Sequence, residues 1–189
     1  LVTAALVVAA AAGRRPLGAA LVWTLCLYAY SAALKTRPLL GNLMVAAVSS
    51  SGFVLGALLA DRPQAALVPT LLAFLFIMGR EIVKDVEDLP GDGACGARTL
   101  ARQLGPRRAL AVALGFFLVF TLLVPWPYWL QLYGRAYLLT YGLGVVPLLA
   151  LAAWLMWRDP RPQSLLRVSW LLKLDMLLGV LGFYFGAGR

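Results

Sequence analysis

The sequence lacks histidine altogether and has only two cysteines and eight acidic residues in 189 positions. Without imidazole, this chain by itself builds neither a histidine-ligated zinc or haem site nor a histidine acid–base catalyst. Cys26 lies within an apolar run and Cys95 within a polar stretch, so we expect no disulfide between them. The sequence therefore excludes imidazole-based metal sites and a disulfide framework.

Charge is scarce as well: 13% of the residues are charged, whereas 62% are hydrophobic. A soluble domain of this composition would lack polar atoms to cover its surface, so most of the chain is expected to face lipid. We therefore predict an all-α fold, a polytopic transmembrane helical bundle in one domain over residues 1–189. Apolar runs suited to helices of about 20 residues predict six spans: Pro16–Leu34, Pro38–Ala60, Pro63–Gly79, Ala109–Leu130, Ala136–Trp157 and Val168–Ala187.

The first residues form a shorter apolar run. As a helix, Leu1–Ala12 would rise only about 18 Å, which is less than the hydrocarbon core. The chain opens on Leu, has no basic segment before this run and shows no small-residue cleavage site, which argues against a signal peptide. We expect Leu1–Ala12 to be the end of a seventh span and the chain to be truncated at its N-terminus.

The net charge of +9 is distributed beside the spans rather than in a stripe, so we expect no nucleic-acid partner. Most of the Lys and Arg residues fall in segments 35–37, 80–108 and 158–167, which the predicted spans place on one face of the membrane. The positive-inside pattern then predicts an integral protein of the cytoplasmic membrane with these segments in the cytoplasm.

Five of the eight acidic residues form a cluster just after the Pro63–Gly79 run: Glu81, Asp85, Glu87, Asp88 and Asp92. If its helix continues, Glu81, Asp85 and Asp88 share one face, where their carboxylates repel unless a cation lies between them. Pro90-Gly91 is expected to break the helix and to let Asp92 fold back toward the same point. Oxygen ligands without His or Cys favour Mg²⁺, which carboxylates usually hold together with substrate phosphates.

Basic residues accompany this cluster. Arg80 and Lys84 flank the carboxylates, and Lys35, Arg37 and Arg98 lie in loops predicted on the same face, where they are available for phosphate oxygens. The alternative is that Arg80–Glu81 and Lys84–Asp88 are ordinary ion pairs on a solvated helix end. The residues by themselves leave both interpretations open.

The polar loop 80–108 contains Gly79-Arg-Glu-Ile-Val-Lys-Asp-Val-Glu-Asp-Leu-Pro-Gly-Asp92 and then Gly96-Ala-Arg-Thr-Leu100. This stretch resembles the second aspartate-rich motif of the UbiA superfamily of intramembrane prenyltransferases. The motif, Asp-x-x-x-Asp with Gly four residues later, matches Asp88, Asp92 and Gly96, and Asp85 matches a further acidic position of many members.

A second segment, Tyr30-Ser-Ala-Ala-Leu-Lys35 followed by Pro38-Leu-Leu-Gly-Asn42, resembles the stretch between the fourth and fifth helices of the family. Many members have Tyr-x-x-x-Lys there, whereas Tyr30 and Lys35 are five residues apart. The resemblance implies that the spans correspond to the third to ninth of nine helices. The first two helices and the first motif, Asn-Asp-x-x-Asp, are missing from this sequence, so we expect the chain alone to be inactive.

The resemblance implies a role for each matching residue. Asp88 and Asp92 would be catalytic, and Asp85, Asp88 and Asp92 would hold Mg²⁺. The diphosphate of the prenyl donor would contact Lys35, Lys84, Arg80 and Arg98. Supporting roles are assigned to Glu81, Tyr30, Asn42, Lys173 and Asp175.

Lys173 and Asp175 also stand out because ionisable groups inside a span are functional by default. At a spacing of i, i+2 they do not share a helix face, so we expect no ion pair between them. Lys173 is close enough to the start of its span to extend to the interface.

The implied function is Mg²⁺-dependent transfer of a prenyl group from its diphosphate to a lipophilic acceptor in a membrane. The motif residues look most like those of geranylgeranylglycerol phosphate geranylgeranyltransferases of ether-lipid synthesis, which favours a geranylgeranyl donor. One alternative is transfer to an aromatic acceptor, such as a quinone, tocopherol or haem precursor. A second is a transporter or a non-catalytic membrane protein.

Aromatic residues suggest two further features. Trp126, Tyr128, Trp129, Tyr133 and Tyr137 are predicted to form an interfacial belt opposite the acidic loop. Tyr184 and the Phe residues of the last span are candidates for lining a cavity for the isoprenoid tail. The pairs Gly52/Gly56 and Gly182/Gly186 have the spacing that permits close helix packing in lipid.

Overall fold

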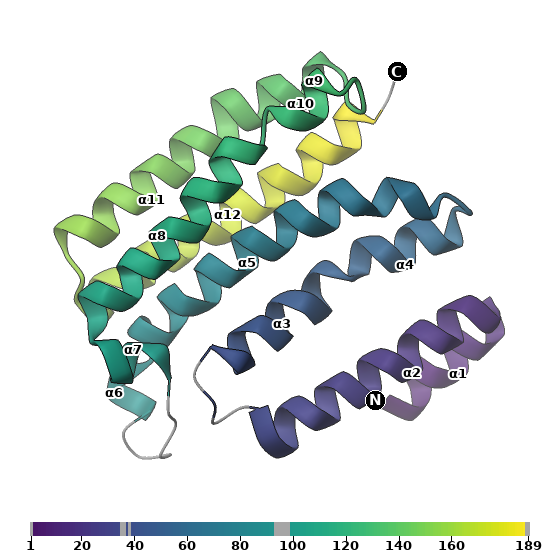
Figure 1. The fold of residues 1–189 in the computed structure, drawn as a ribbon, viewed down its shortest axis with the longest axis horizontal. Helices are drawn as coiled ribbons and strands as arrows, with labels where there is room; N and C mark the ends of the chain where they lie inside the picture. Colours follow the sequence, from purple (N-terminus) through teal and green to yellow (C-terminus); the bar gives the residue numbers. More distant parts are fainter. Residues whose placement is uncertain (1, 35–36, 38, 93–98, 188–189) are drawn as a thin grey trace.

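The computed structural model describes residues 2–34, 37, 39–92 and 99–187, and every regular element in these ranges is a helix. Figure 1 shows the arrangement. The elements are α1 (Val2–Ala12), α2 (Arg14–Ala29), η1 (Tyr30–Leu34), α3 (Leu40–Ser50), α4 (Gly52–Leu59), η2 (Pro63–Ala66), α5 (Leu67–Glu87), α6 (Leu89–Asp92), α7 (Leu100–Leu104), α8 (Pro106–Leu123), α9 (Trp126–Trp129), α10 (Arg135–Thr140), η3 (Tyr141–Val145), α11 (Val146–Arg158) and α12 (Pro162–Gly186).

In the described ranges, 5 continuous helices are long and apolar enough to cross a membrane: Leu40–Leu59, Pro63–Glu87, Pro106–Trp129, Arg135–Arg158 and Pro162–Gly186. The predicted all-α polytopic fold is therefore confirmed, and the chain is an integral membrane protein. The first predicted span, Pro16–Leu34, is not among them. Its α-helical part, α2, has 16 residues, which rise about 24 Å, and the π-helical η1 follows.

Two spans contain an interruption with a local cause. Between α3 and α4, the Ser50 hydroxyl donates to the Ala47 carbonyl at 3.2 Å and the Ser51 hydroxyl donates to the Val48 carbonyl at 2.7 Å. Such back-bonding bends helices. In the fourth span, Pro147 lacks the N–H that would bond four residues back, and the π-helical turn η3 precedes it.

Helix α5 lies between the two halves of the bundle. It packs against α3 on one side and against α8 and α12 on the other, while α1 and α2 form a hairpin at the edge (Figure 1). Its buried face carries Leu72, Phe76, Ile82, Val83 and Val86, which join the main hydrophobic core. The helix that bears the acidic residues is thus held on three sides.

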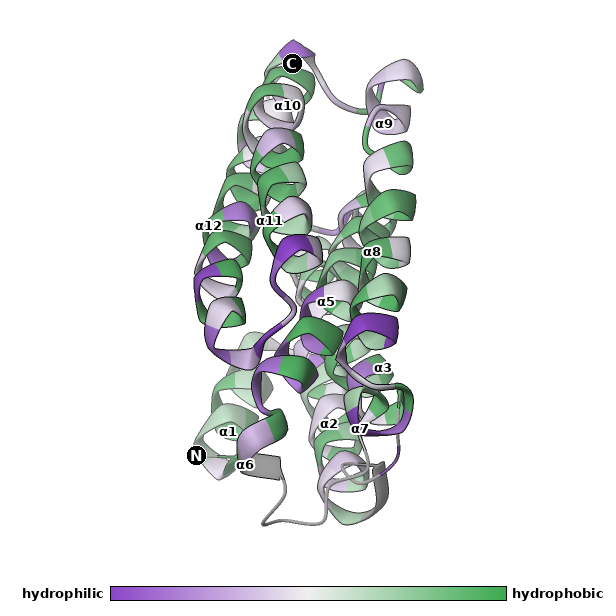
Figure 2. Ribbon diagram, turned by 90° about the vertical axis from the view of Figure 1, so that its left-hand side faces the viewer, coloured by the Kyte–Doolittle hydropathy of each residue, from purple (hydrophilic) through white to green (hydrophobic). Residues whose placement is uncertain are grey.

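Polar residues gather at one end of this bundle. Figure 2 shows hydrophobic residues along the middles of the helices and hydrophilic residues around α6, α7 and the start of α12. Much of the predicted polar loop 80–108 is helical. Residues 80–87 extend α5, as the spacing of the acidic residues predicts, whereas α6, α7 and the start of α8 correct the expectation of a loop over the rest. The acidic residues therefore stand on a packed helix, because the apolar face of α5 continues through Val86.

The loop between α11 and α12 lies at the same end. The Arg161 guanidinium donates to Asp159 from Nε and Nη2, both at 2.7 Å, and the Ser164 hydroxyl donates to it at 2.5 Å. These bonds hold the pKa of the Asp159 carboxyl well below its ordinary value. They tie the first turn of α12 to the end of α11.

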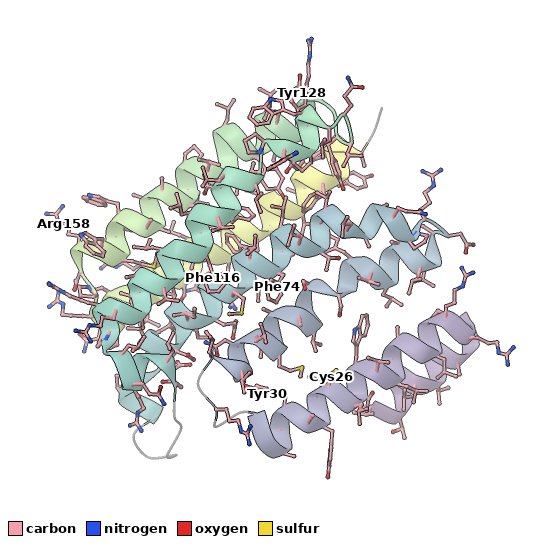
Figure 3. All side chains as sticks on the ribbon, viewed as in Figure 1. Cys26, Tyr30, Phe74, Phe116, Tyr128 and Arg158 are labelled. Carbon is pink, nitrogen blue, oxygen red and sulfur yellow. The ribbon has the colours of Figure 1, made fainter. Side chains whose placement is uncertain are left out.

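The aromatic belt prediction is correct only in part. Trp126 and Trp129 are exposed, and Tyr128 lies at the opposite end of the bundle from Arg158 (Figure 3). Tyr137, however, is fully buried and donates its hydroxyl to the Val124 carbonyl at 2.8 Å. The helix α10 begins at Arg135 and turns this ring toward α12, so Tyr137 is a core residue rather than a membrane anchor.

The two glycine pairs behave differently. A Cβ atom at Gly182 would lie 2.7 Å from the Tyr141 ring, and one at Gly186 would lie 2.4 Å from the Tyr137 Cβ. At Gly52 and Gly56 a Cβ atom would meet nothing within 4 Å. Only Gly182 and Gly186 therefore permit the close helix approach that their spacing predicts.

Candidate active site

The acidic cluster occupies the last two turns of α5 and the residue that follows. The helix continues past the predicted span as expected, but it ends at Glu87 rather than at Pro90-Gly91. Asp88 is a turn residue, and Pro90 stands in the first turn of the short helix α6, where a missing N–H is tolerated. Proline therefore begins the next helix here and does not terminate the preceding one.

Two ion pairs lie within the cluster. Lys84 Nζ is 2.9 Å from Asp88 Oδ2, with both side chains about half exposed. Arg80 Nη1 is 2.5 Å from Glu81 Oε1, and these side chains are only 20% and 17% exposed. Both ion pairs expected for an ordinary solvated helix end are therefore present. The Arg80–Glu81 pair, however, is mostly buried and does not lie on a solvated helix end. Arg80 Nε is buried and has no hydrogen-bond partner in the described part of the chain.

Asn42, near the start of α3, contacts the cluster directly. Its Nδ2 donates a hydrogen bond of 2.8 Å to Asp85 Oδ2. The two residues are far apart in the sequence and meet because α3 packs against α5. The structure thereby joins the two separate segments that carry the sequence resemblance.

A further contact joins the cluster to the last helix. The Ser169 hydroxyl of α12 donates to the Glu87 carboxylate. We did not predict Ser169, because a single serine near the start of an apolar span carries no sequence signal. Together with Asn42, it fixes the end of α5 between α3 and α12.

Several predicted site residues lie outside the described residues, namely Lys35, Arg98 and the side chain of Asp92. Among the described residues, no three acidic side chains lie close enough together to hold a metal ion. Of the three predicted Mg²⁺ ligands, Asp85 and Asp88 are those whose side chains the structure describes.

Tyr30, Lys173 and Asp175, which were assigned supporting roles, make no hydrogen bond or ion pair with the acidic residues of α5 among the contacts of the described chain. Tyr30 begins η1 at the end of α2 (Figure 3). Lys173 is exposed, and its ammonium group lies 4.4 Å from the centre of the Trp170 ring. Asp175 is buried, so the spacing argument that Lys173 and Asp175 occupy different faces is confirmed.

A cavity of about 230 Å³ lies deeper in the bundle, among α3, α4, α5, α8, η3 and α12. Its lining is mostly aromatic and aliphatic, and Phe183 contributes to it as the sequence suggested for the last span. Tyr184 and Phe185 are exposed instead. The remaining polar groups of the lining come from Ser49, Tyr141 and Asp175.

This arrangement suits the binding of an amphipathic ligand. The acidic end of the bundle offers carboxylates, Lys84 and Arg80, which fit a metal-bound or free phosphate group. The cavity deeper in the bundle offers apolar surface for a hydrocarbon chain. Two carboxylates without imidazole or thiolate form a donor set that fits Mg²⁺, since this ion is commonly held by one or two carboxylates together with phosphates.

Comparison with known proteins gives consistent relatives. The chain is 41% identical over 160 residues to the digeranylgeranylglyceryl phosphate synthase of Methanopyrus kandleri, covering 83% of this chain and 57% of the relative. It is 40% identical over 164 residues to the enzyme of that name from Natronomonas pharaonis, covering 85% and 56%. The chain therefore spans somewhat more than half the length of these curated relatives.

A solved structure shares the fold. A chain from work on digeranylgeranylglyceryl phosphate synthase in membranes superimposes with a TM-score of 0.84 at 29% sequence identity. The match covers 98% of this chain and 66% of that one. The sequence model described as the UbiA prenyltransferase family matches residues 1–177. With both of its motif segments joined at the end of α5, this chain belongs to the UbiA prenyltransferase family.

Proposed function

We propose that this chain supplies part of the active site of a Mg²⁺-dependent enzyme that transfers a geranylgeranyl group from its diphosphate to geranylgeranylglyceryl phosphate. The proposal takes its substrates from the relatives of known name and its residues from this structure. It includes the two substrates, a prenyl diphosphate and a lipophilic phosphate acceptor, as partners within the membrane.

One observation carries the proposal: the acidic cluster at the end of α5 is tied to α3 and α12, and an apolar cavity lies deeper in the same bundle. Asp85 is held by Asn42, and Glu87 is held by Ser169. Such restraint favours catalysis, because charged groups that are already oriented need little reorganisation when charge develops.

The residues divide between the charged and the apolar parts of the substrates. Asp85, Asp88 and Asp92 would hold Mg²⁺, which supplies positive charge that stabilises the leaving diphosphate. Lys84 and Arg80, with Lys35 and Arg98, would contact the remaining phosphate oxygens, and the buried Nε of Arg80 has a donor to offer. The apolar cavity would hold hydrocarbon and keep water away from the reacting carbon.

The site is proposed to face the cytoplasm. The ends of α5 and α11 and the starts of α8 and α12 lie together at the acidic end of the bundle (Figure 1). These ends carry several basic residues, among them Arg107, Arg108 and Arg158. The positive-inside pattern assigns such an end to the cytoplasmic side.

The function is tested with protein expressed from the complete gene and purified in detergent. We expect prenylation of geranylgeranylglyceryl phosphate by geranylgeranyl diphosphate in the presence of Mg²⁺, and none after chelation by EDTA. An aromatic quinone precursor offered in the same reaction identifies the competing acceptor class. Prenylation of the aromatic ring alone, or transfer that survives EDTA, would reject the proposal.

Asn42 gives a prediction about the geometry of the metal site. Replacing Asn42 by Ala removes the amide that orients Asp85, so we expect the Mg²⁺ concentration for half-maximal transfer to rise about 10- to 100-fold. Gln163→Ala is the matched control, because this exposed amide lies at the same end of the bundle. Equal Mg²⁺ dependence of the Asn42 variant and the control would show that the hydrogen bond has no part in metal binding.

A further inference from the structure

Asp175 is a buried carboxyl group of α12 that borders the apolar cavity. It is 1% exposed, and neither Oδ1 nor Oδ2 has a hydrogen-bond partner in the described part of the chain. Burying such a group within an apolar bundle costs free energy unless a polar partner compensates it. An apolar side chain at position 175 would avoid this cost. We therefore look for a ligand that forms hydrogen bonds with the carboxyl group.

The position of Asp175 relates it to both parts of the site. It lies six residues after Ser169 on α12, which corresponds to about 9 Å along the helix. Ser169 contacts Glu87, so the carboxyl group lies about 9 Å deeper along α12 than the acidic cluster. Of the residues that α12 contributes to the cavity lining, Asp175 is the nearest to that cluster, and Phe183 is the farthest.

The other polar side chains of the lining are those of Ser49 and Tyr141, and neither hydrogen-bonds this carboxyl group. The Tyr141 hydroxyl donates to the Gly179 carbonyl at 3.1 Å, so its proton is already engaged. Phe53, Phe76 and Phe183 supply aromatic surface around the cavity. At about 230 Å³, the cavity exceeds the roughly 150 Å³ of an apolar cavity that binds benzene. It therefore accommodates a segment of a hydrocarbon chain.

We propose that Asp175 binds the hydroxyl group of a lipid alcohol whose hydrocarbon chain occupies this cavity. A hydroxyl group is small enough to enter with the chain, and it both donates to and accepts from a carboxyl group. Resting on the proposed function, the alcohol is the acceptor, and Asp175 positions its oxygen below the diphosphate. The name digeranylgeranylglyceryl phosphate describes a glycerol that carries two prenyl groups, so the acceptor of the named relatives has a hydroxyl to be prenylated.

The test compares two ligands that differ only in the hydroxyl group. Geranylgeraniol and the C20 hydrocarbon of the same skeleton are titrated against the purified chain in detergent, and binding is followed by native mass spectrometry. We expect the alcohol to bind at least about 10-fold more tightly, since a site built for a hydroxyl rejects an analogue without one. Equal binding of the two ligands would overturn the proposal.

Three variants separate a hydroxyl-binding role from a merely structural one. Asp175→Leu is expected to lose the preference and to bind both ligands alike, whereas Asp175→Asn, which keeps polar atoms, is expected to retain a preference. Ala73→Phe fills the cavity and is expected to weaken binding of both ligands with the carboxyl group intact. A full preference in Asp175→Leu, or unchanged binding in Ala73→Phe, would contradict the assignment.

These results are distinguishable from failure of the proposed function. If the chain prefers the alcohol through Asp175 but the complete gene product transfers no prenyl group, the hydroxyl site stands and the enzymatic proposal falls. If transfer occurs with equal binding of alcohol and hydrocarbon, the enzyme stands and the role of Asp175 is refuted.

Discussion

Replacing Asp88 by Asn is expected to abolish prenyl transfer by the protein expressed from its complete gene, with a loss of at least about 100-fold in kcat/KM. The substitution keeps the shape of the side chain and removes its charge. Charge stabilisation of the leaving group by a bound metal contributes several kcal/mol, and each 1.4 kcal/mol corresponds to about tenfold in rate. The measurement is radiolabelled prenyl transfer at saturating Mg²⁺.

The alternative interpretation of Asp88 makes a different prediction. If this carboxylate serves only to pair with Lys84 at 2.9 Å, its loss would change stability by at most about 1 kcal/mol and leave transfer intact. Asp61→Asn is the control, because this exposed carboxylate pairs with Arg15 at the opposite end of the bundle. Equal activity of the two variants would remove Asp88 from the site.

Replacing Gly182 by Leu is expected to lower the free energy of unfolding by about 3 kcal/mol, because overpacking a close helix contact forces side chains or backbone to move. Even a Cβ atom there would lie 2.7 Å from the Tyr141 ring. That ring is buried and packed against Phe120, Tyr137 and Phe183, so it has little room to yield.

The measurement is thermal unfolding in detergent, followed by near-ultraviolet circular dichroism. Gly56→Leu is the matched control, since a Cβ atom at Gly56 meets nothing within 4 Å. We expect the control to unfold like the wild type. Equal destabilisation by both substitutions would mean that chain flexibility, rather than the contact of α12 with η3, explains the glycine at 182.

The second motif illustrates how far the residues themselves lead. The spacing of Glu81, Asp85 and Asp88 predicts a common helix face, and α5 does continue to Glu87. The predicted end of that helix, at Pro90-Gly91, was wrong by a few residues. Proline can stand in the first turn of a new helix as well as end the preceding one, and the sequence does not distinguish the two. The pairing of Asn42 with Asp85 depends on how α3 packs, which no local pattern specifies.

The aromatic residues near residues 126–137 show the same limit of prediction from the sequence. Five of them cluster near one turn in the sequence, and the interfacial belt is the simplest interpretation of such a cluster. Trp126 and Trp129 satisfy it, whereas Tyr137 is fully buried. Its hydroxyl finds the Val124 carbonyl and its ring packs against Tyr141, so neither contact is visible before the helices are assembled.

The sequence by itself determined the membrane-spanning helical class, most of the helix bounds and the acidic segment. These features depend on the length of an apolar run and the spacing of charges, which are local properties of the chain. Only the tertiary structure decided which residues meet. It brought Asn42 and Ser169 to the acidic end of α5, and it buried Asp175 beside an apolar cavity with no hydrogen-bond partner among the described residues. Side-chain partners across helices depend on packing between distant segments, and packing is a property of the whole bundle.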